Sequence, residues 1–328
     1  MMNVQLQDVP GLAAALMAAE TTGLLAALVE RPGSVADLAA RCHLDPRACA
    51  HVLDVLEAFN LTARADDCYR AGDKLMQLAD RPRALAEFEA RLWTHAPVFL
   101  KTGTPLITMD AAPGEREGIY RDVVAELGKL FAGAAEQLAE RCGLTPHSIL
   151  DVGCGSGVWS LAFAQRLPAA RVTGLDLPAV LEQFRTRAAT LGLSDRVATI
   201  AGDMHTAPIP SGQWDLAIIA NVLRLEPVAA ARTLVARGVD ALRPGGSLLI
   251  VDALAAGTDA ARRARSVYAL HLAMRTHSAR VHTAAEVAEW MKEAGCESPV
   301  EVLFDQRSAS LASVGALIAR KQERSASL

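Results

Sequence analysis

The sequence lacks the features that would place the protein in a membrane or on a nucleic acid. No apolar run in its 328 residues reaches the roughly 20 residues of a membrane span, and Met1–Pro10 lacks the basic start and apolar core of a signal peptide. Lysine and arginine number 33 against 37 aspartates and glutamates, a formal net charge of −4, so there is no basic excess for non-specific nucleic-acid binding. We expect a cytoplasmic protein without a membrane or nucleic acid as its partner.

Aromatic residues and cysteine pairs are also scarce. Aromatic residues are 4 % of the chain, whereas hydrophobic residues are 51 %, which is enough for a core without disulfides. The six cysteines are scattered, and none forms a CxxC pair. Cys42, His43, Cys49 and His51 lie close together in the sequence, but their spacing matches no usual zinc motif. We therefore predict no metal site and no disulfide framework.

The first 80 residues have the pattern of a small helical domain. Gly11–Leu28 is rich in alanine and leucine, and a turn separates it from the amphipathic helix predicted over Val35–Cys42. Pro46–Phe59 begins with a proline and continues as a further helix, and Leu61–Tyr69 is predicted to be a hairpin. Helix, turn, helix and hairpin is the order of a winged-helix unit, spanning residues 1–80.

A winged helix binds DNA in some proteins and mediates packing or dimerisation in others. A recognition helix needs cationic and amide side chains that reach phosphates and base edges. The helix in that position, Pro46–Phe59, carries the cation Arg47 against the anions Asp54 and Glu57. This charge pattern favours dimerisation over DNA binding.

Residues 81–146 are predicted to form a helical linker to a second domain. Leu85–Leu100 and Tyr120–Arg141 are amphipathic and are separated by a segment that contains glycine and proline. From residue 147, short apolar runs alternate with amphipathic helices, which predicts a parallel α/β sheet with helices on both faces. The domain is expected to span residues 147–321 and to precede a flexible tail, 322–328. The apolar runs are Ile149–Val152, Arg171–Leu175, Val197–Ile200, Leu216–Ala220 and Ser247–Asp252.

Three features at the ends of successive predicted strands point to a nucleoside site. Glycines at 153, 155 and 157 follow the first strand, and glycine permits a sharp turn and the close approach of a ligand. Asp176 ends the second strand, where a carboxylate can accept both ribose hydroxyls of a nucleoside. After the third strand, Asp203 can face the exocyclic amine of adenine and Met204 can cover its ring.

The glycine turn departs from the dinucleotide fingerprint G-x-G-x-x-G, because Val158 and Ser160 stand where its third glycine would be. With Asp151 before it, the turn instead resembles that of the class I methyltransferases, which bind S-adenosylmethionine, and Leu242–Gly246 resembles the turn before their fifth strand. The resemblance implies a Rossmann-like domain with a mostly parallel seven-stranded sheet and S-adenosylmethionine as its cofactor. The cofactor contacts that it implies are Asp151, Gly153, Gly155, Asp176, Leu177, Gly202, Asp203, Met204 and Asn221.

The whole chain resembles the small-molecule O-methyltransferases of secondary metabolism, which combine a winged-helix N-terminus, a helical linker and a methyltransferase domain. Asn221–Leu223, Arg280–Thr283 and Trp290 support this narrower resemblance. It implies a homodimer formed through the N-terminal domain and a small aromatic or polyketide-like substrate. Of the pocket positions that it implies, we take Trp93, Phe99 and Met274 as substrate contacts, and His95, Tyr268, His271 and Arg275 are further candidates.

The resemblance fails at the catalytic base. The family has a histidine where this chain has Arg224, which stays protonated and cannot accept a proton. The family also orients its base with two carboxylates. Asp252 fills one of these positions, whereas Val281 replaces the other carboxylate.

Three explanations of this departure stay open. Arg224, held by Asp252, binds an acidic substrate that needs no base, because proximity supplies most of the acceleration. Alternatively, His271 is the base. In the third, the fold performs C-methylation or a non-methylating reaction with the same cofactor. A transcription regulator with a degenerate sensor domain is an alternative from a different functional class, which the few cations of Pro46–Phe59 disfavour.

Overall fold

The structure is a computed structural model that describes residues 5–79, 83–110, 113–254, 257–302 and 313–323. The chain divides into two compact units between Ala96 and Pro97. The division lies within α6 (Arg83–Thr102), a helix that the sequence places in the linker. Most of the predicted tail, residues 324–328, lies outside the described residues. The two units are described separately below.

The first unit contains the predicted order of helix, turn, helix and hairpin. Ser34 accepts a hydrogen bond from the Asp37 N–H and begins α3, and Asp45 accepts one from the Ala48 N–H and begins α4. The hairpin strands β2 and β3 pair antiparallel, and β1 pairs with β3. The bounds are η1 (Leu6–Asp8), α1 (Val9–Thr21), α2 (Leu24–Glu30), β1 (Gly33–Ser34), α3 (Val35–Cys42), α4 (Pro46–Ala58), β2 (Thr62–Ala65), β3 (Cys68–Ala71) and α5 (Asp73–Ala79).

The alanine- and leucine-rich segment Gly11–Leu28 is divided between two helices, α1 and α2. Gly23 adopts φ +82°, a left-handed conformation that favours glycine and interrupts the helical ladder. The Thr22 hydroxyl and N–H both bond to the Ala18 carbonyl and close the end of α1. The apolar composition concealed this break, since both segments are rich in alanine and leucine.

The core of the first unit lies between α2, α3, α4 and the hairpin. Leu28, Leu38, Leu53 and Tyr69 are almost completely buried, and the Tyr69 hydroxyl donates a hydrogen bond to Asp54 at 2.8 Å. Among the described residues, no single helix has the length and apolarity of a membrane span. The bent pair Leu6–Thr21 and Leu24–Glu30 meets that test together, by length and composition only.

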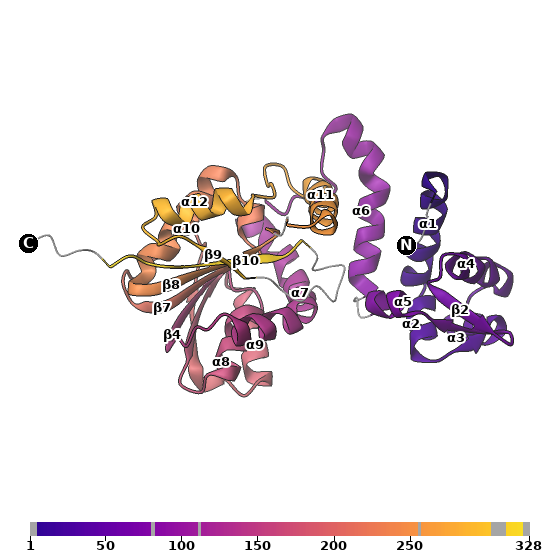
Figure 1. The fold of residues 1–328 in the computed structure, drawn as a ribbon, viewed down its shortest axis with the longest axis horizontal. Coiled ribbons are helices and arrows are strands. Elements are labelled where there is room, and N and C mark those ends of the chain that lie inside the picture. Colours follow the sequence, from indigo (N-terminus) through magenta and orange to yellow (C-terminus); the bar gives the residue numbers. More distant parts are fainter. Residues whose placement is uncertain (1–4, 80–82, 111–112, 255–256, 303–312, 324–328) are drawn as a thin grey trace, which may run out of the picture. The chain divides into compact units, whose positions relative to one another are not determined.

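The second unit is a three-layer α/β structure around a seven-stranded sheet with the order β6-β5-β4-β7-β8-β10-β9 (Figure 1). Strands β4 to β8 pair in parallel, and β10 pairs antiparallel with both β8 and β9, so the predicted mostly parallel seven-stranded sheet is confirmed. The strands are β4 (Ser148–Val152), β5 (Arg171–Asp176), β6 (Val197–Ala201), β7 (Trp214–Ala220), β8 (Leu242–Asp252), β9 (Val300–Val302) and β10 (Gly315–Arg320).

Helices cover both faces of this sheet, and each face has its own apolar core. Helices α7, α8 and α9 pack on one face around Ile149, Phe163 and Phe184, and α10 and α12 pack on the other around Leu234 and Val287. The bounds are α7 (Pro113–Arg141), α8 (Val158–Arg166), α9 (Leu181–Thr190), η2 (Ser194–Arg196), η3 (Leu223–Leu225), α10 (Val228–Ala241), α11 (Asp259–Ala273) and α12 (Ala284–Glu293). Because the parallel strands point the same way, the segments that follow β4, β5, β6 and β7 meet at one edge, where α/β sheets bind ligands.

Candidate functional site

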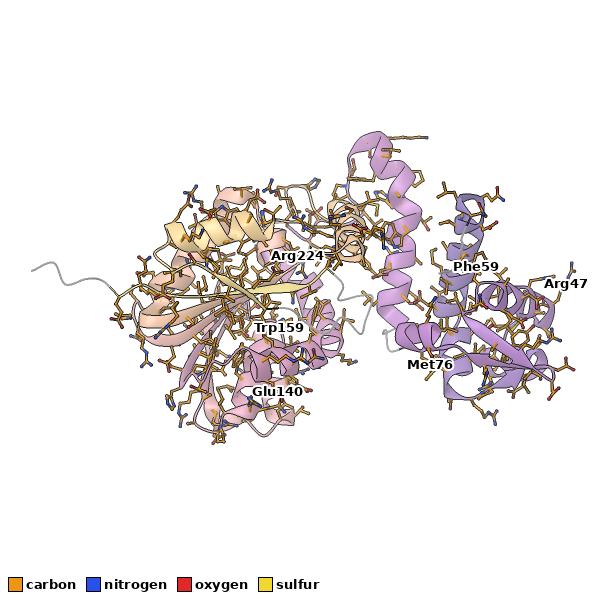
Figure 2. The ribbon with its side chains drawn as sticks, in the orientation of Figure 1. Arg47, Phe59, Met76, Glu140, Trp159 and Arg224 are labelled. Atoms are coloured by element: carbon orange, nitrogen blue, oxygen red, sulfur yellow. The ribbon has the colours of Figure 1, made fainter. Side chains whose placement is uncertain are left out.

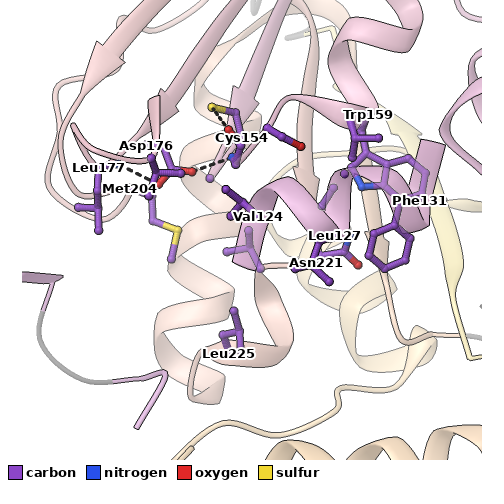
Figure 3. A pocket seen from close by; sticks show the side chains of 18 of the residues that line it. Val124, Leu127, Phe131, Cys154, Trp159, Asp176, Leu177, Met204, Asn221 and Leu225 are labelled. Atoms are coloured by element: carbon purple, nitrogen blue, oxygen red, sulfur yellow. Dashed lines mark hydrogen bonds between the residues drawn. The ribbon is translucent and has the colours of Figure 1, made fainter. Parts of the chain in front are cut away.

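A solvent-open cavity with an empty volume of about 980 Å³ lies along this edge of the sheet (Figure 3). Its wall is formed by α7, the glycine turn after β4, the ends of β5 to β7, η3 and the turn after α11. Clefts of this size hold small-molecule ligands when a few polar groups converge in an apolar wall. All the lining residues belong to the second unit.

The glycine turn forms the floor of the cavity and is folded back onto β5. The N–H groups of Gly153 and Cys154 both donate to the Leu175 carbonyl, at 2.8 and 3.1 Å. Gly153 has φ +68°, and a Cβ there would lie 2.7 Å from Cγ2 of Val222, so a larger residue would be strained and would clash. Burial raises the pKa of the Cys154 thiol well above its ordinary value, as do the charges of Asp176 and Asp151. The thiol therefore stays protonated, which fits a spacer rather than a nucleophile.

Asp176 lies at the end of β5 and links two segments of the site. Its Oδ2 accepts the Gly155 N–H and its Oδ1 accepts the Leu177 N–H, both at 2.8 Å (Figure 3). A carboxylate has about four acceptor positions, so acceptor capacity remains on the cavity side. Met204 also lines the cavity, with its sulfur 3.6 Å from the position that a Cβ of Gly153 would take. The structure thus brings the predicted ribose acceptor and adenine contact to one cavity.

The other predicted cofactor residues divide into those on the cavity wall and those behind it. Leu177, Gly202 and Asn221 lie on the wall with Gly153 and Gly155. Asp203 is not on the wall, and its Oδ1 accepts the His205 N–H at 2.8 Å. The predicted roles of these residues in cofactor binding stay predictions.

Asp151 lies behind the glycine turn, where it connects β4 with α8. It is 2 % exposed, and its Oδ2 accepts the Ser160 hydroxyl at 2.5 Å. Burial, and to a smaller extent the charge of Asp176, raise the pKa of this carboxyl to about 7 against the opposing effect of the hydrogen bond from Ser160. The position indicates that Asp151 supports the turn from behind, because it is absent from the cavity wall.

Arg224 belongs to the second unit (Figure 2), where it lies in η3 on the cavity wall. Several contacts fix its side chain. Nη1 donates to Asp252 Oδ1 at 3.0 Å and to Asn221 Oδ1 at 2.7 Å, and the Arg224 N–H donates to Asp252 Oδ2 at 3.2 Å. Burial alone would lower the pKa of the guanidinium, but its interactions with Tyr268 and with the carboxylate of Asp252 raise it above its ordinary value. The ion pair predicted between Arg224 and Asp252 is therefore present, and Arg224 stays a cation.

His282 fixes the backbone of η3, a role that the sequence did not reveal. Its Nε2 lies 2.9 Å from the Leu223 carbonyl oxygen and 3.2 Å from that of Glu226. Both partners are acceptors, so Nε2 carries the proton, and Nδ1 accepts from Arg280 Nε at 3.3 Å. His282 is 2 % exposed, and its ring lies edge-on to Trp290, with the ring centroids 5.0 Å apart. The two bonded carbonyls flank Arg224, so this histidine is a positioning residue for it.

A second contact between polar side chains lies at the same wall. Glu226 Oε2 is 3.1 Å from Nε2 of His205, and Glu226 is 7 % exposed and lines the cavity. His205 directly follows Met204, so the pair connects the segment after β6 with the segment after β7. The sequence shows both residues but no pattern that pairs them.

The structure does not place the predicted substrate residues or the alternative base on the cavity wall. Met274 is fully buried at the end of α11, and its carbonyl accepts the Leu106 N–H. His271 is buried and stacks on Tyr268, with ring centroids 5.9 Å apart. Phe99 is half-buried in α6, and Trp93 belongs to the first unit. Their proposed contacts with substrate stay predictions.

Several wall residues were not predicted individually. Val124, Leu127 and Phe131 come from one face of α7, and Phe131 contacts Trp159 of α8 with ring centroids 5.7 Å apart (Figure 3). Their spacing of three or four residues is the signal that places them on one face, but not the signal that tells which side of the helix faces a ligand. Met109 and the pocket candidate Arg275 complete the wall.

No group of three or more histidine, cysteine, aspartate or glutamate side chains within the described ranges could hold a metal ion. Cys42, His43, Cys49 and His51 lie within these ranges and form no such group. Cys49 is buried in the core of the first unit, where burial is the main cause that raises the pKa of its thiol.

Comparison with known proteins agrees with this geometry. A family model described as an O-methyltransferase domain matches residues 102–297. The tetracenomycin polyketide synthesis 8-O-methyl transferase TcmO of Streptomyces glaucescens is 27 % identical over 301 residues, which cover 86 % of each chain. The aclacinomycin 10-hydroxylase RdmB of Streptomyces purpurascens is 37 % identical over 148 residues, 45 % of this chain and 39 % of RdmB. The structure of human N-acetylserotonin methyltransferase in complex with S-adenosylmethionine superposes with a TM-score of 0.74 at 20 % identity, and covers 97 % of this chain and 96 % of the human chain.

Proposed function

The chain belongs to the O-methyltransferase family and is an S-adenosylmethionine-dependent methyltransferase, and we propose that it methylates an oxygen of a small aromatic, polyketide-like metabolite. The name of TcmO, which matches over most of both chains, supports the polyketide class. The observation that carries the chemical part of the proposal is Arg224, a buried cation on the cavity wall where the family has its histidine base.

The cavity offers what the cofactor requires. Asp176 presents a carboxylate to the ribose hydroxyls, the glycine turn allows the close approach of the ligand, and Met204 provides an apolar contact for the adenine ring. When bound, S-adenosylmethionine supplies an activated methyl group together with its own leaving group. The protein therefore has to hold the acceptor oxygen in line and keep it unprotonated.

We propose that Arg224 keeps the acceptor oxygen unprotonated by stabilising its anion. A nearby cation lowers the pKa of a phenol, which is about 10 in water, because it favours the charged form. Asp252 and Asn221 fix the guanidinium, so it stabilises the oxyanion without having to reorganise first. The acceptor then binds as a phenolate or enolate, and a protein base is not required.

The test uses methyl-labelled S-adenosylmethionine with a panel of hydroxynaphthalenes and hydroxyanthraquinones. We expect label in an O-methyl ether, at a rate that varies little between pH 7 and 9. In the double variant R224Q/D252N, which removes both charges together, the rate at pH 7 should fall by about 100-fold and rise with pH as the phenol ionises in solution. An unchanged rate and pH profile in this variant, with activity lost in H271A, would make His271 the base instead.

The proposal includes a homodimer formed through the first unit. Helix α1 is apolar around much of its circumference, yet Val9 is 45 % exposed and Leu6 in the adjoining η1 is 89 % exposed. A helix that is apolar all round is normally covered by other protein. Light scattering on the eluted protein should give twice the mass of one chain, and V9E should reduce it toward a single chain.

A second candidate function is a reaction other than O-methylation with the same cofactor. It is supported by the 37 % identity to RdmB, whose name describes a hydroxylase, and by the cation at the base position. The labelled cofactor separates the candidates: label on carbon indicates C-methylation, and turnover without label in the product indicates a non-methylating reaction.

A further inference from the structure

The two cations on the cavity wall differ in how they are paired with carboxylates. Two cations line the described cavity, Arg224 and Arg275. Arg224 is paired with Asp252 at 3.0 Å, and Glu226, two residues further along the chain, has its Oε2 3.1 Å from Nε2 of His205. Within the described part of the chain, Arg275 forms no ion pair with a carboxylate. A guanidinium without a counter-ion in a partly desolvated wall favours an anionic ligand.

The contacts of Arg275 leave most of its hydrogen-bonding capacity unused. Nη2 donates to the Tyr268 hydroxyl oxygen at 2.6 Å, and Nη1 lies 3.7 Å from the thioether sulfur of Met109, a weak acceptor. Nε is shielded from solvent and has no hydrogen-bond partner among the described residues. Within the described ranges, one of the five N–H donors therefore has an oxygen acceptor. The planar guanidinium matches the two oxygens of a carboxylate.

Tyr268 connects the two cations. Cζ of Arg224 lies 5.2 Å from the centroid of its ring, and Cζ of Arg275 lies 5.5 Å from it. The ring therefore contacts both a cation that is paired with Asp252 and a cation that has no carboxylate partner among the described residues. The arrangement gives Arg224 and Arg275 different tasks on one wall.

The segment before α7 fixes the position of Arg275. The Leu106 N–H donates to the Met274 carbonyl at 2.7 Å, and the Met109 N–H donates to the Arg275 carbonyl at 2.9 Å. The Asp110 carboxylate accepts the backbone N–H groups of His277 and Ser278, at 2.8 and 2.6 Å, so its charge is directed at the backbone of this turn. The pKa of the Asp110 carboxyl is lowered by these bonds, which outweigh the opposing effect of its burial.

We propose that Arg275 binds a carboxylate of the methyl acceptor, so that the substrate is a hydroxylated aromatic carboxylic acid. This inference rests on the proposed function and adds a second anionic group to its substrate, separate from the oxygen that Arg224 stabilises. Tyr268 is a positioning residue in this scheme, since its hydroxyl oxygen holds Nη2 and its ring lies against both guanidiniums.

The test compares a probe acid with its neutral amide, 3-hydroxy-2-naphthoic acid and 3-hydroxy-2-naphthamide, by calorimetry in the presence of S-adenosylhomocysteine. The wild-type protein should bind the acid at least about tenfold more tightly than the amide. R275M should reduce this ratio to about one with little change in the affinity for the amide, and R275K should retain part of it because a lysine lacks the planar pair of donors. R262M on the exposed face of α11 is the matched control and should leave the ratio unchanged.

The positioning role of Tyr268 has its own readout. Y268F should lower the ratio of acid to amide affinity by less than R275M does, because the cation is kept and its orientation is lost. The inference would be overturned if the wild-type protein bound the acid no more tightly than the amide, or did not bind the acid. It would also be overturned if R275M left the ratio of the two affinities unchanged. Cofactor affinity and label transfer to hydroxynaphthalenes that lack a carboxylate are measured alongside. If the wild-type protein neither binds the cofactor nor transfers label, the proposed function is refuted. If it does both and the ratio of acid to amide affinity is near one, only the carboxylate site is refuted.

Discussion

Replacing Asp176 by alanine should abolish tight binding of the cofactor. The carboxylate already accepts the N–H groups of Gly155 and Leu177, and its remaining acceptor positions are available to two ribose hydroxyls. A hydrogen bond to a charged acceptor contributes about 1.5–3 kcal/mol, so losing two of them costs about 3–6 kcal/mol. The dissociation constant of S-adenosylhomocysteine should therefore rise by about two to four orders of magnitude.

The calorimetric assay needs one further variant, one control and a check of folding. Asp176→Asn preserves the shape of the side chain but turns an amide N–H toward the N–H of Gly155 or Leu177, so it should also bind weakly. Asp195→Ala removes an exposed carboxylate of the same unit and should bind as the wild type does. Affinity within threefold of the wild type in a normally folded Asp176→Ala protein would show that this carboxylate does not hold the ribose.

Three further predictions concern the scaffold of the site. His282→Asn leaves buried carbonyls without a donor, so it should lower the free energy of unfolding by about 1–3 kcal/mol in urea titrations and lower kcat more than it changes the KM for the cofactor. The pKa of the buried Asp151 carboxyl is about 7 in the folded protein and 3.8 in the unfolded chain, so the free energy of unfolding should fall as the pH rises from about 4 to above 7. Asp151→Asn should be more stable than the wild type at pH 8 but not at pH 3.5. Hydrogen bonds from Thr283, of which the one from its N–H has the largest effect, lower the Glu286 pKa from 4.5 to about 2. The stabilisation present above pH 4.5 should therefore be lost as the pH falls toward 2, and in Glu286→Gln the free energy of unfolding from urea titrations should depend less on pH in this range.

The sequence was sufficient where the site is built from the ends of neighbouring strands. The glycine turn, Asp176 and Met204 each follow a predicted strand, and parallel strands bring these ends to one edge of the sheet. The pairing of Arg224 with Asp252 was predictable for the same reason, since they lie at the ends of the adjacent strands β7 and β8. Strand order and direction thus convert positions far apart in the sequence into contacts.

The sequence was insufficient where helices and loops define the wall. The contact between Met109 and Arg275 joins residues 166 positions apart, and no periodicity relates the segment before α7 to the turn after α11. Met274 shows the same limit: it adjoins Arg275 but is buried, because the direction of a side chain at the end of a helix depends on how that helix packs. The role of His282 could not be read either, since its partners are backbone carbonyls, which every residue possesses.

The position of Asp252 shows why membership of a family does not by itself determine the catalytic role of residue 224. Asp252 accepts the backbone N–H of residue 224 through one oxygen, a bond that any residue except proline can donate, and uses its other oxygen for the side chain. With a histidine at 224 that second oxygen would orient a base, whereas with Arg224 it fixes a permanent cation. A single side chain therefore exchanges proton removal for anion stabilisation on an unchanged scaffold. Because Arg224 serves the acceptor oxygen in this scheme, a second anionic group on the substrate needs a further cation, and Arg275 lies on the same cavity wall without a counter-ion among the described residues.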